Sequence, residues 1–477
     1  MGTGTSGHQA LLVDLYELTM AAGYFENGVN YPSTFELFVR DLPEHRSYLV
    51  AAGLEQAVDY LETFRFQSEE IDFLRSHPTF AHVREAFFDY LKHFRFRGDL
   101  WAMPEGTLVF PEEPILRVSA PLIEAQIVET YLLSMINFQT MIATKATRVV
   151  AAAAGRGVIE FGTRRAHGPE AGVLAARAAY LGGCLGTSNV YAGFQMGIPI
   201  FGTAAHSWTM TFEDEEEAFE KYCRAFPDSA LLLIDTYDTV EGARKAARMG
   251  QRVKGVRIDS GDLLKTSQQV RRILDDAGLS GVQILASGDL NEYKIRDLVQ
   301  HGAPIDVFGV GTELATSHDA AALGGVYKLV EQTVGNSPRY RMKLSAQKAT
   351  YPGKKQVFRF MNAREELDHD VIAREDEPTQ GVPLLERVMA EGQRLAPLPS
   401  LRAARERAAL NFSRLQERYA TFENPDTYPV TKSQALEGLF QKMKHLNSGG
   451  TSEDTAAEKK LSAALSQTID LKGDPSL

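Results

Sequence analysis

A histidine follows a short apolar segment near the middle of the chain. His206 lies within "GTAAHSWTM", directly after "GIPIF", and its neighbours Gly202, Ala204 and Ala205 are small. The small neighbours leave room around the imidazole at a place where a buried strand is expected to end, as a reactive histidine would need. A single histidine is more often a packed or solvated side chain with one hydrogen bond. The other polar residues must decide between these interpretations.

Arginines and small polar residues follow other short apolar segments. "FGTRRAHG" contains Arg164 and Arg165, and "GVRIDSGD" contains Arg257. A guanidinium fork suits phosphate or carboxylate better than lysine does, and glycine next to serine or threonine, as in "GTSN", "ASGD" and "GVGT", offers backbone amides to anions. A surface salt bridge explains Arg165 equally well. Arg257 alternates with Val256 and Ile258, so we expect it to point into the fold.

Four aspartates follow three of these segments: Asp235, Asp259, Asp262 and Asp289. Carboxylate oxygens together with phosphate are the usual ligands of magnesium, so Asp259 and Asp289 are candidate ligands of Mg²⁺. Capping of a helix N-terminus is the alternative, and we expect it for at least one of the four. The histidines of these segments lack the spacing of a zinc or iron site.

A repeated unit positions these residues: a short apolar segment, a polar cluster and a helical stretch. Seven copies occur at intervals typical of βα units: "GVIEFGTRR", "GGCLGTSN", "IPIFGTAAHS", "LLLIDTYDT", "KGVRIDSGD", "VQILASGD" and "IDVFGVGT". Continuous apolar strands followed by helices predict a parallel sheet, and seven in series favour an α/β barrel. The barrel would gather at one mouth Phe161, Arg164, Arg165, Thr187, Ser188, Thr203, His206, Asp235, Arg257, Asp259, Ser287, Asp289 and Thr312. An open dinucleotide-binding sheet would split them between two edges, and its glycine-rich turn is missing.

The length of the chain and the changes in its pattern of apolar and polar residues predict more than one domain. Residues 1–125 mix helical patterns with short strands and predict an α/β sandwich domain, and residues 126–334 form the barrel. Residues 335–400 return to the first domain and make it discontinuous, with a hairpin expected around Pro352-Gly353. Residues 401–477 form a C-terminal helical region and a polar tail.

Charge and cysteine content exclude several classes of protein. A formal net charge of −11 and a pI near 5.6 argue against a nucleic-acid-binding or anionic-membrane surface. No apolar run approaches membrane-spanning length, and the N-terminus lacks the pattern of a secretory signal. Two cysteines, Cys184 and Cys223, fit a reducing compartment. We expect a cytoplasmic protein without nucleic-acid or membrane partners.

Motifs spread over most of the chain resemble one family, the nicotinate phosphoribosyltransferases. They are "DLYELTMA", "FELFVRDLP", "INFQTMIATKATR", "EFGTRRAHG", "GTSNVYAG", "GTAAHSW", "VRIDSGDL", "FGVGTEL" and "NPDTYPV". The resemblance implies an irregular (β/α) barrel with an N-terminal α/β sandwich domain, assembled as a homodimer with active sites at the subunit interface. It also implies a reaction of NAD salvage, formally a ligase reaction. Nicotinate and 5-phosphoribosyl 1-diphosphate give nicotinate mononucleotide and diphosphate, with ATP as co-substrate and Mg²⁺ as cofactor.

The resemblance assigns roles to particular residues. It makes His206 the phosphorylated histidine. It places the aromatic side chains that stack on the pyridine ring at Tyr16 and Phe161, Tyr16 coming from the neighbouring subunit, and it places the nicotinate and ribose-phosphate contacts at Arg164, Arg165, Ser188, Thr203, Arg257 and Thr312. The chemistry of the residues adds Asp259 as a second catalytic residue, which with magnesium would neutralise the leaving group, and the phosphate-binding clusters "ASGD" and "GVGT" add Ser287, Gly288 and Gly311.

Two other functions stay open at this point. A nicotinamide phosphoribosyltransferase would resemble this chain, but the resemblance would place an aspartate at Ser188 to accept from the amide. Next to the carboxylate of nicotinate an aspartate would be repelled, whereas serine can donate a hydrogen bond. A barrel that binds nucleotides without turnover is the second alternative, and the presence of His206, Arg257, Asp259 and Thr312 argues against it.

Overall fold

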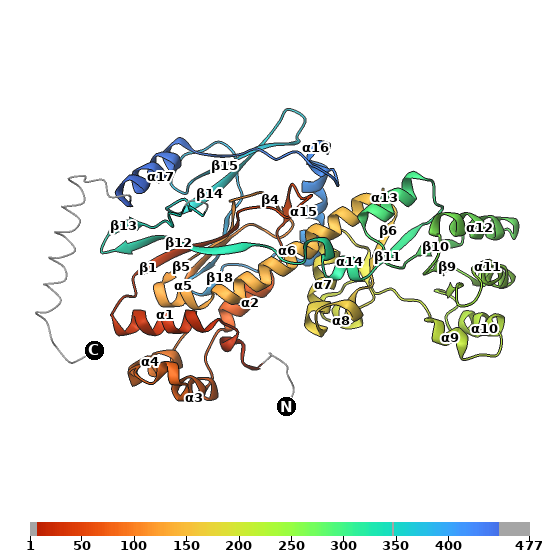
Figure 1. Ribbon diagram of the computed structural model, residues 1–477, viewed down its shortest axis with the longest axis horizontal. Helices are drawn as coiled ribbons and strands as arrows, with labels where there is room; N and C mark the ends of the chain where they lie inside the picture. The colour runs from red at the N-terminus through yellow and green to blue at the C-terminus, as the bar shows by residue number, and fades with distance from the viewer. Residues whose placement is uncertain (1–6, 346–347, 448–477) are drawn as a thin grey trace, which may run out of the picture.

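The computed structural model describes residues 7–345 and 348–447, and the predicted polar tail therefore lies mostly outside the described residues. Figure 1 shows two bodies side by side, a group of antiparallel strands and a group of short parallel strands ringed by helices. The helix α6 (Glu129–Ala152) runs between them. No helix within the described ranges is long and apolar enough to cross a membrane.

The parallel strands confirm the repeated unit. Their order is β7-β6-β11-β10-β9-β8, and Ile200 adds a seventh segment through a parallel bridge to Thr187. The strands are β6 (Gly157–Glu160), β7 (Gly186–Thr187), β8 (Leu231–Leu233), β9 (Gly255–Ile258), β10 (Gln283–Ala286) and β11 (Val307–Val310). Among the described residues no backbone pairing joins Ile200 to β8, so the ladder is open on one side rather than fully closed. The predicted irregular barrel is confirmed.

Helices alternate with these strands and cover them. They are α7 (Pro169–Leu181), α8 (Val190–Met196), α9 (His206–Met210), α10 (Glu215–Ala225), α11 (Thr239–Arg248), α12 (Leu263–Asp276), α13 (Glu292–Gln300) and α14 (Thr312–Ala315). Alternate strand residues point away from these helices and line an internal cavity of about 180 Å³ with Ile159, Leu231, Leu285 and Val307 among its walls. The period of two along each strand therefore separates a helix-facing core from the barrel interior.

The antiparallel body is built from both halves of the chain. Its main sheet has the order β13-β12-β1-β5-β3-β17-β18, so strands from before and after the barrel are hydrogen-bonded neighbours. They are β1 (Pro32–Val39), β3 (Asp99–Ala102), β5 (Pro114–Pro121), β12 (Gly325–Val334), β13 (Ser337–Tyr340), β17 (Glu386–Ala390) and β18 (Gln393–Arg394). The predicted discontinuous domain is confirmed. The exact domain boundaries stay predictions, although β12 already pairs with β1 in this sheet.

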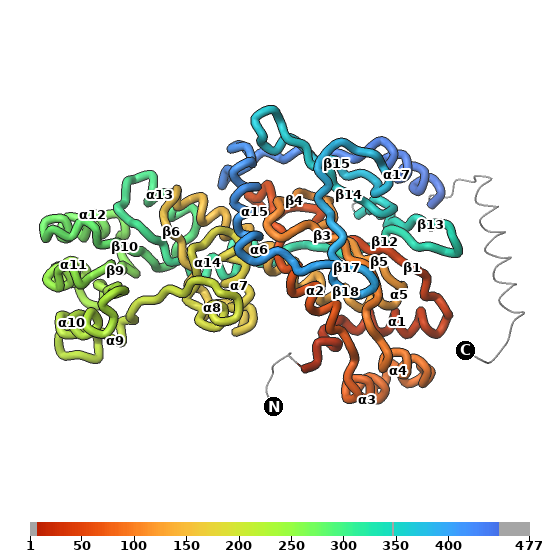
Figure 2. Tube along the Cα trace, turned by 180° about the vertical axis from the view of Figure 1, so that it is seen from behind, coloured from red at the N-terminus to blue at the C-terminus, as the bar shows by residue number. Residues whose placement is uncertain are grey.

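Smaller elements complete this body. A second sheet has the order β16-β14-β15-β19, with β16 (Val382–Pro383), β14 (Lys355–Met361), β15 (Leu367–Arg374) and β19 (Val430–Lys432), and a third pairs β2 (Leu49–Val50) with β4 (Leu108–Val109). Figure 2 shows helices of the chain start and of the chain end on opposite sides of the strands. The helices are α1 (Leu15–Glu26), α2 (Leu54–Thr63), α3 (Ser68–Ser76), α4 (Glu85–Lys92), α5 (Leu122–Ile127), α15 (Leu401–Ser413), α16 (Glu417–Ala420) and α17 (Gln434–Asn447).

The hairpin expected around Pro352-Gly353 is wrong. β13 pairs with β12, and β14 pairs with β15, so the two strands that flank this turn belong to different sheets. The turn residues Gly335 and Glu365, both at positive φ, lie in the two hairpins that do form. Proline-glycine chemistry predicted a turn correctly, but it could not specify which strands the turn connects.

Candidate functional site

Apart from Tyr16, the predicted site residues lie in the parallel strands or in the segments that follow them. Phe161 follows β6, Asp259 follows β9, Ser287 follows β10, and Thr312 follows β11 and begins α14. Parallel strands present their carboxyl ends at one edge, so these side chains share one rim of the barrel. Hydrogen bonds between them show that several meet directly.

Arg257 makes hydrogen bonds to three of these side chains. Its Nε donates to Ser287 Oγ at 2.8 Å, its Nη1 to Thr203 Oγ1 at 2.8 Å, and its Nη2 to Asp259 Oδ1 at 2.7 Å. Its guanidinium carbon lies 5.7 Å from the centre of the Phe161 ring. One side chain therefore joins residues of four separate βα units. The prediction that Arg257 points inward from its strand is confirmed.

Asp259 and Asp235 connect the loops of the rim through hydrogen bonds. The Oδ1 of Asp259 also accepts from Ser287 Oγ at 2.5 Å, and its backbone N donates to Asp235 Oδ2 at 2.9 Å. Ser260 Oγ donates to the same Asp235 oxygen at 2.8 Å. The predicted capping role belongs to Asp262, whose carboxylate accepts from the backbone N of Lys265 at the start of α12.

The side chains of the rim could supply only some of the ligands that Mg²⁺ needs. Among the described residues no three side chains of His, Cys, Asp or Glu form a group that could hold a metal ion. Asp259 Oδ1 is engaged by Arg257 and Ser287, which leaves Oδ2 on a carboxylate that is 31% exposed. Mg²⁺ commonly takes one or two protein carboxylates and completes its shell with substrate phosphate and water, so the residues present fit such an ion.

His206 begins the short helix α9 on the open side of the ladder. Its Nδ1 lies 3.3 Å from Thr236 Oγ1, and its Nε2 lies 4.0 Å from Asp259 Oδ2. The side chain is 43% exposed. Trp208 anchors the same helix, because its indole N–H donates to the carbonyl of Ala218 in α10 at 3.1 Å. The imidazole is thus held beside the rim by its helix while one ring edge stays accessible.

Two glycines allow the rim segments to approach closely. Gly288 has φ +100°, and a side chain there would collide with the carbonyl of Asp259. A Cβ on Gly309 would lie 2.5 Å from the ring of Phe161, so glycine is needed for this ring to pack over the strand end. Gly311 precedes α14 and accepts from the backbone N of Leu314. Gly288 thus supports the predicted site through its backbone, and Gly309 is an addition to it.

The loop around Ser188 is fixed by a residue that the motif analysis did not select. Glu160 at the end of β6 is buried, accepts from Thr187 Oγ1 at 2.5 Å and accepts from the backbone N of Gly162. Its carbonyl accepts from the backbone N of Ser188 at 2.9 Å. Burial raises the pKa of Glu160 above its ordinary value. An acid inside the otherwise apolar "GVIEFG" was the sequence signal for this role.

Arg164 and Arg165 lie in a 3-10 turn, Thr163–Arg165, directly after Phe161, and both are exposed. Asp289 follows Gly288, has φ +48° and uses its carbonyl to accept from Lys294 Nζ at 2.8 Å. These residues lie next to the rim without joining the hydrogen bonds around Arg257. Thr236 is a further residue missed by the motif analysis, because it contacts His206 across 30 positions of sequence.

Tyr16 does not meet the other predicted residues within one chain. It lies in α1, which Figures 1 and 2 place in the antiparallel body, away from the strands β6 to β11. The ring is 44% exposed. Partial burial, followed by the neighbouring carboxylate of Glu129, raises the pKa of its hydroxyl.

Comparisons with known proteins cover nearly the whole chain. Three family models match: the N-terminal domain of nicotinate phosphoribosyltransferase at residues 11–137, the nicotinate phosphoribosyltransferase family at residues 157–355, and the C-terminal domain at residues 377–440. The nicotinate phosphoribosyltransferase pncB2 of Mycobacterium tuberculosis is 43% identical over 91% of this chain and 94% of its own length. The nicotinate phosphoribosyltransferase of Bacillus subtilis is 39% identical over 89% of this chain and 93% of its own length.

Solved structures agree with these matches. The crystal structure of human nicotinic acid phosphoribosyltransferase superposes with a TM-score of 0.80 at 32% identity, covering 91% of this chain and all of that one. A nicotinate-nucleotide pyrophosphorylase from Pyrococcus furiosus gives 0.71 at 26% identity, covering 87% of this chain and 97% of that one. The similarity thus includes both bodies of the fold.

Proposed function

Because the chain belongs to the nicotinate phosphoribosyltransferase family, we propose that its barrel rim joins nicotinate to 5-phosphoribosyl 1-diphosphate in a step coupled to ATP hydrolysis. Family and relatives make the chain a nicotinate phosphoribosyltransferase and imply a role in NAD salvage. The coupling to ATP and the roles of individual residues are the finer parts of the proposal. The observation that carries them is the set of three hydrogen bonds from Arg257 to Ser287, Thr203 and Asp259.

The reaction needs orientation and charge stabilisation more than covalent help from the protein. The pyridine nitrogen forms a bond to C1 of the ribose, the bond from C1 to diphosphate breaks, and the transition state has oxocarbenium character. The guanidinium of Arg257 supplies positive charge beside the ring of Phe161, where it can face the carboxylate of nicotinate. Ser287, Gly288, Gly311 and Thr312 supply hydroxyl and amide donors for phosphate, and exposed Arg164 and Arg165 add positive charge. Mg²⁺, when bound, would neutralise diphosphate, with Asp259 and Asp289 as its protein ligands.

His206 is the site of phosphoryl transfer from ATP. Thr236 contacts Nδ1, so a proton on Nδ1 leaves the Nε2 lone pair free on the side of Asp259. Nε2 attacks the γ-phosphorus, the bond to the bridging oxygen breaks, and ADP leaves. Water later hydrolyses the phosphohistidine to inorganic phosphate and restores the neutral ring. The accessible ring edge and the small residues Gly202, Ala204 and Ala205 support this role.

We further propose a homodimer in which Tyr16 completes the site of the partner subunit. Tyr16 and its neighbours Leu15 and Met20 expose apolar surface on α1. Helix α1 lies away from β6, the strand that Phe161 follows (Figure 1). Two aromatic faces are well suited to hold a flat, electron-poor pyridine. A cytoplasmic location is part of the same proposal, supported by the two free, buried cysteines Cys184 and Cys223.

The function is tested by supplying nicotinate or nicotinamide with 5-phosphoribosyl 1-diphosphate, each with and without ATP. We expect nicotinate mononucleotide to form from nicotinate and to increase with ATP. Formation of the amide product alone would favour the nicotinamide activity, and no product from either base would favour a binding protein.

The histidine is tested with ATP labelled at the γ-phosphate. We expect an acid-labile label on the wild-type protein and on His301→Ala, a change at an exposed histidine at the end of α13. His206→Ala should take up no label. Label that persists in His206→Ala would contradict the assignment.

A further inference from the structure

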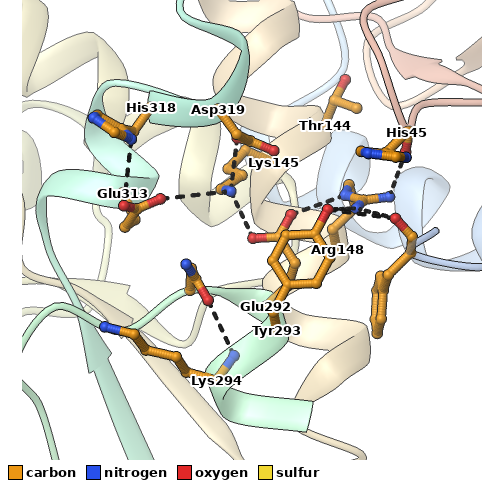
Figure 3. Close-up of polar contacts among 12 residues, drawn as sticks. His45, Thr144, Lys145, Arg148, Glu292, Tyr293, Lys294, Glu313, His318 and Asp319 are labelled. Carbon is orange, nitrogen blue, oxygen red and sulfur yellow. Dashed lines mark hydrogen bonds and ion pairs between the residues drawn. The ribbon is translucent and has the colours of Figure 1, made fainter. Parts of the chain in front are cut away.

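A buried lysine lies at the junction of the two bodies. Lys145, in the middle of α6, is fully buried, and Figure 3 shows its ammonium group among three carboxylates. Its Nζ lies 2.6 Å from Glu292 Oε2, 2.8 Å from Asp319 Oδ1 and 3.9 Å from Glu313 Oε2. Burying an isolated ammonium is very costly, and these three carboxylates offset that cost.

Two arginines complete the group. Arg148 Nε lies 3.0 Å from Glu292 Oε1, and Arg46 Nη2 lies 2.8 Å from Asp319 Oδ2. We call Arg46, Lys145, Arg148, Glu292, Glu313 and Asp319 the buried charge network. Its three cations balance its three anions. Burial alone would raise the pKa of Glu292, but Lys145 and Arg148 outweigh it and lower that pKa.

The carboxylates of this network begin or follow the rim loops. Glu292 is the first residue of α13 and comes three positions after Asp289. Glu313 directly follows Thr312 in α14, and Asp319 lies in the next 3-10 turn, His318–Ala320. One ammonium group therefore connects the loop after β10 with the loop after β11, and fixes both to α6.

The segment after β11 contains a residue in an unfavourable backbone conformation, which contacts from outside the segment must stabilise. Ser317 is buried at φ +42°, a left-handed conformation that residues other than glycine rarely adopt, and its hydroxyl has no hydrogen-bond partner among the described residues. Such a conformation persists only where surrounding contacts impose it. Glu313 and Asp319, on either side of Ser317, are both held by Lys145.

We propose that Lys145 is a positioning residue for phosphate binding. It sets the spacing between the Ser287–Asp289 loop and the Gly311–Thr312 loop, which together receive the phosphate groups of 5-phosphoribosyl 1-diphosphate. This inference rests on the proposed function of the rim. Nicotinate depends on Phe161 and Arg257, which make no direct contact with this network among the contacts described. Arg257 is coupled to it only through Ser287, so loss of Lys145 should affect nicotinate less than 5-phosphoribosyl 1-diphosphate.

The test compares Lys145→Met with Lys355→Met. Lys355 is the matched control, because it is also a buried lysine with a buried carboxylate partner, Glu36 at 2.7 Å, but lies in β14 away from the rim. We expect Lys145→Met to raise KM for 5-phosphoribosyl 1-diphosphate at least tenfold and to change KM for nicotinate less than twofold. Lys355→Met should leave both KM values within twofold of wild type. Lys145→Arg, which keeps the charge, should recover part of the loss.

A binding measurement without turnover supports the kinetics. The rise in melting temperature caused by 5-phosphoribosyl 1-diphosphate should shrink in Lys145→Met and persist in Lys355→Met. If Lys145→Met does not fold, Asp319→Asn gives a milder break at the partly exposed edge of the network, with an expected three- to fivefold rise in the same KM.

Equal losses for both substrates, or unchanged values in a folded variant, would overturn the positioning role. Failure of the proposed function looks different. In that case the wild-type protein makes no nicotinate mononucleotide, while the melting experiment still reports whether Lys145 controls phosphate binding.

Discussion

The barrel rim and the buried charge network use similar charged residues, but these residues differ in their exposure to solvent. The charged and imidazole side chains at the rim are 17% exposed for Arg257, 31% for Asp259 and 43% for His206. In the network Lys145 and Glu292 are fully buried. The rim can exchange an internal hydrogen bond for a ligand, whereas the centre of the network is closed to solvent and only its edge, Glu313 at 22% and Asp319 at 29%, is partly exposed. Under the proposals above, charged residues form a site in one region and a frame in the other.

This difference predicts opposite responses to substitution. Removing one partner of a buried pair leaves an uncompensated charge, while removing a partly exposed group leaves water to replace it. Stability should therefore depend on the network and activity on the rim. Three experiments separate the two.

Arg148→Met should produce the largest effect on stability. The change leaves Glu292 with one cation fewer and removes the donors to the carbonyls of His45 and Phe422. We expect a loss of about 3–5 kcal/mol in the free energy of unfolding, measured with urea at pH 7. Arg402→Met, at the exposed ion pair with Glu406 in α15, is the control and should cost no more than about 1 kcal/mol. Similar losses of unfolding free energy in both variants would show that the buried charge network stabilises the protein no more than a surface ion pair does.

Arg257→Ala should leave the fold and abolish most of the activity. We expect kcat/KM to fall at least about 100-fold, which corresponds to about 2.7 kcal/mol, with a change in unfolding free energy within about 1 kcal/mol. Arg257→Lys keeps the charge but cannot donate to Ser287, Thr203 and Asp259 together, so it should recover only part of the rate. A fully active Arg257→Ala would show that the centre of the rim is not the site.

Asp319 gives the network a smaller, pH-dependent contribution. Burial opposes the charged form of this carboxylate, but Arg46 and Lys145 outweigh it and lower its pKa from 3.8 to about 2. A lowered pKa contributes stability above the unfolded-state value, and this contribution is lost as pH falls through about 2. We expect about 2 kcal/mol of stability that is present at pH 5 and mostly lost by about pH 2.

The measurement compares urea unfolding of wild type and Asp319→Asn from pH 5 to pH 2. The gap between the two should close as the pH falls. A gap of constant size would mean that the carboxylate is not held ionised by its partners.

Sequence patterns predicted what depends on local periodicity. The alternation around Arg257 predicted its inward direction, and the repeated strand-end clusters predicted the shared rim, because both follow from strand geometry. The pairings of His206 with Thr236 and of Lys145 with Glu292 could not be predicted in this way. They join residues 30 and 147 positions apart, so they depend on how the barrel curves and on how α6 packs against it. The hairpin predicted around Pro352-Gly353 was wrong for the same reason, because strand pairing there depends on contacts between distant parts of the chain.

The opening between Ile200 and β8 has a consequence for how ligands are admitted. No backbone ladder closes this seam in the described residues, and side chains bridge it instead: Arg257 to Thr203 and His206 to Thr236. We expect an anion that binds Arg257 in place of Thr203 to break one of these two side-chain bridges. Occupancy of the rim and loosening of the segment that carries His206 would then be thermodynamically linked, each favouring the other.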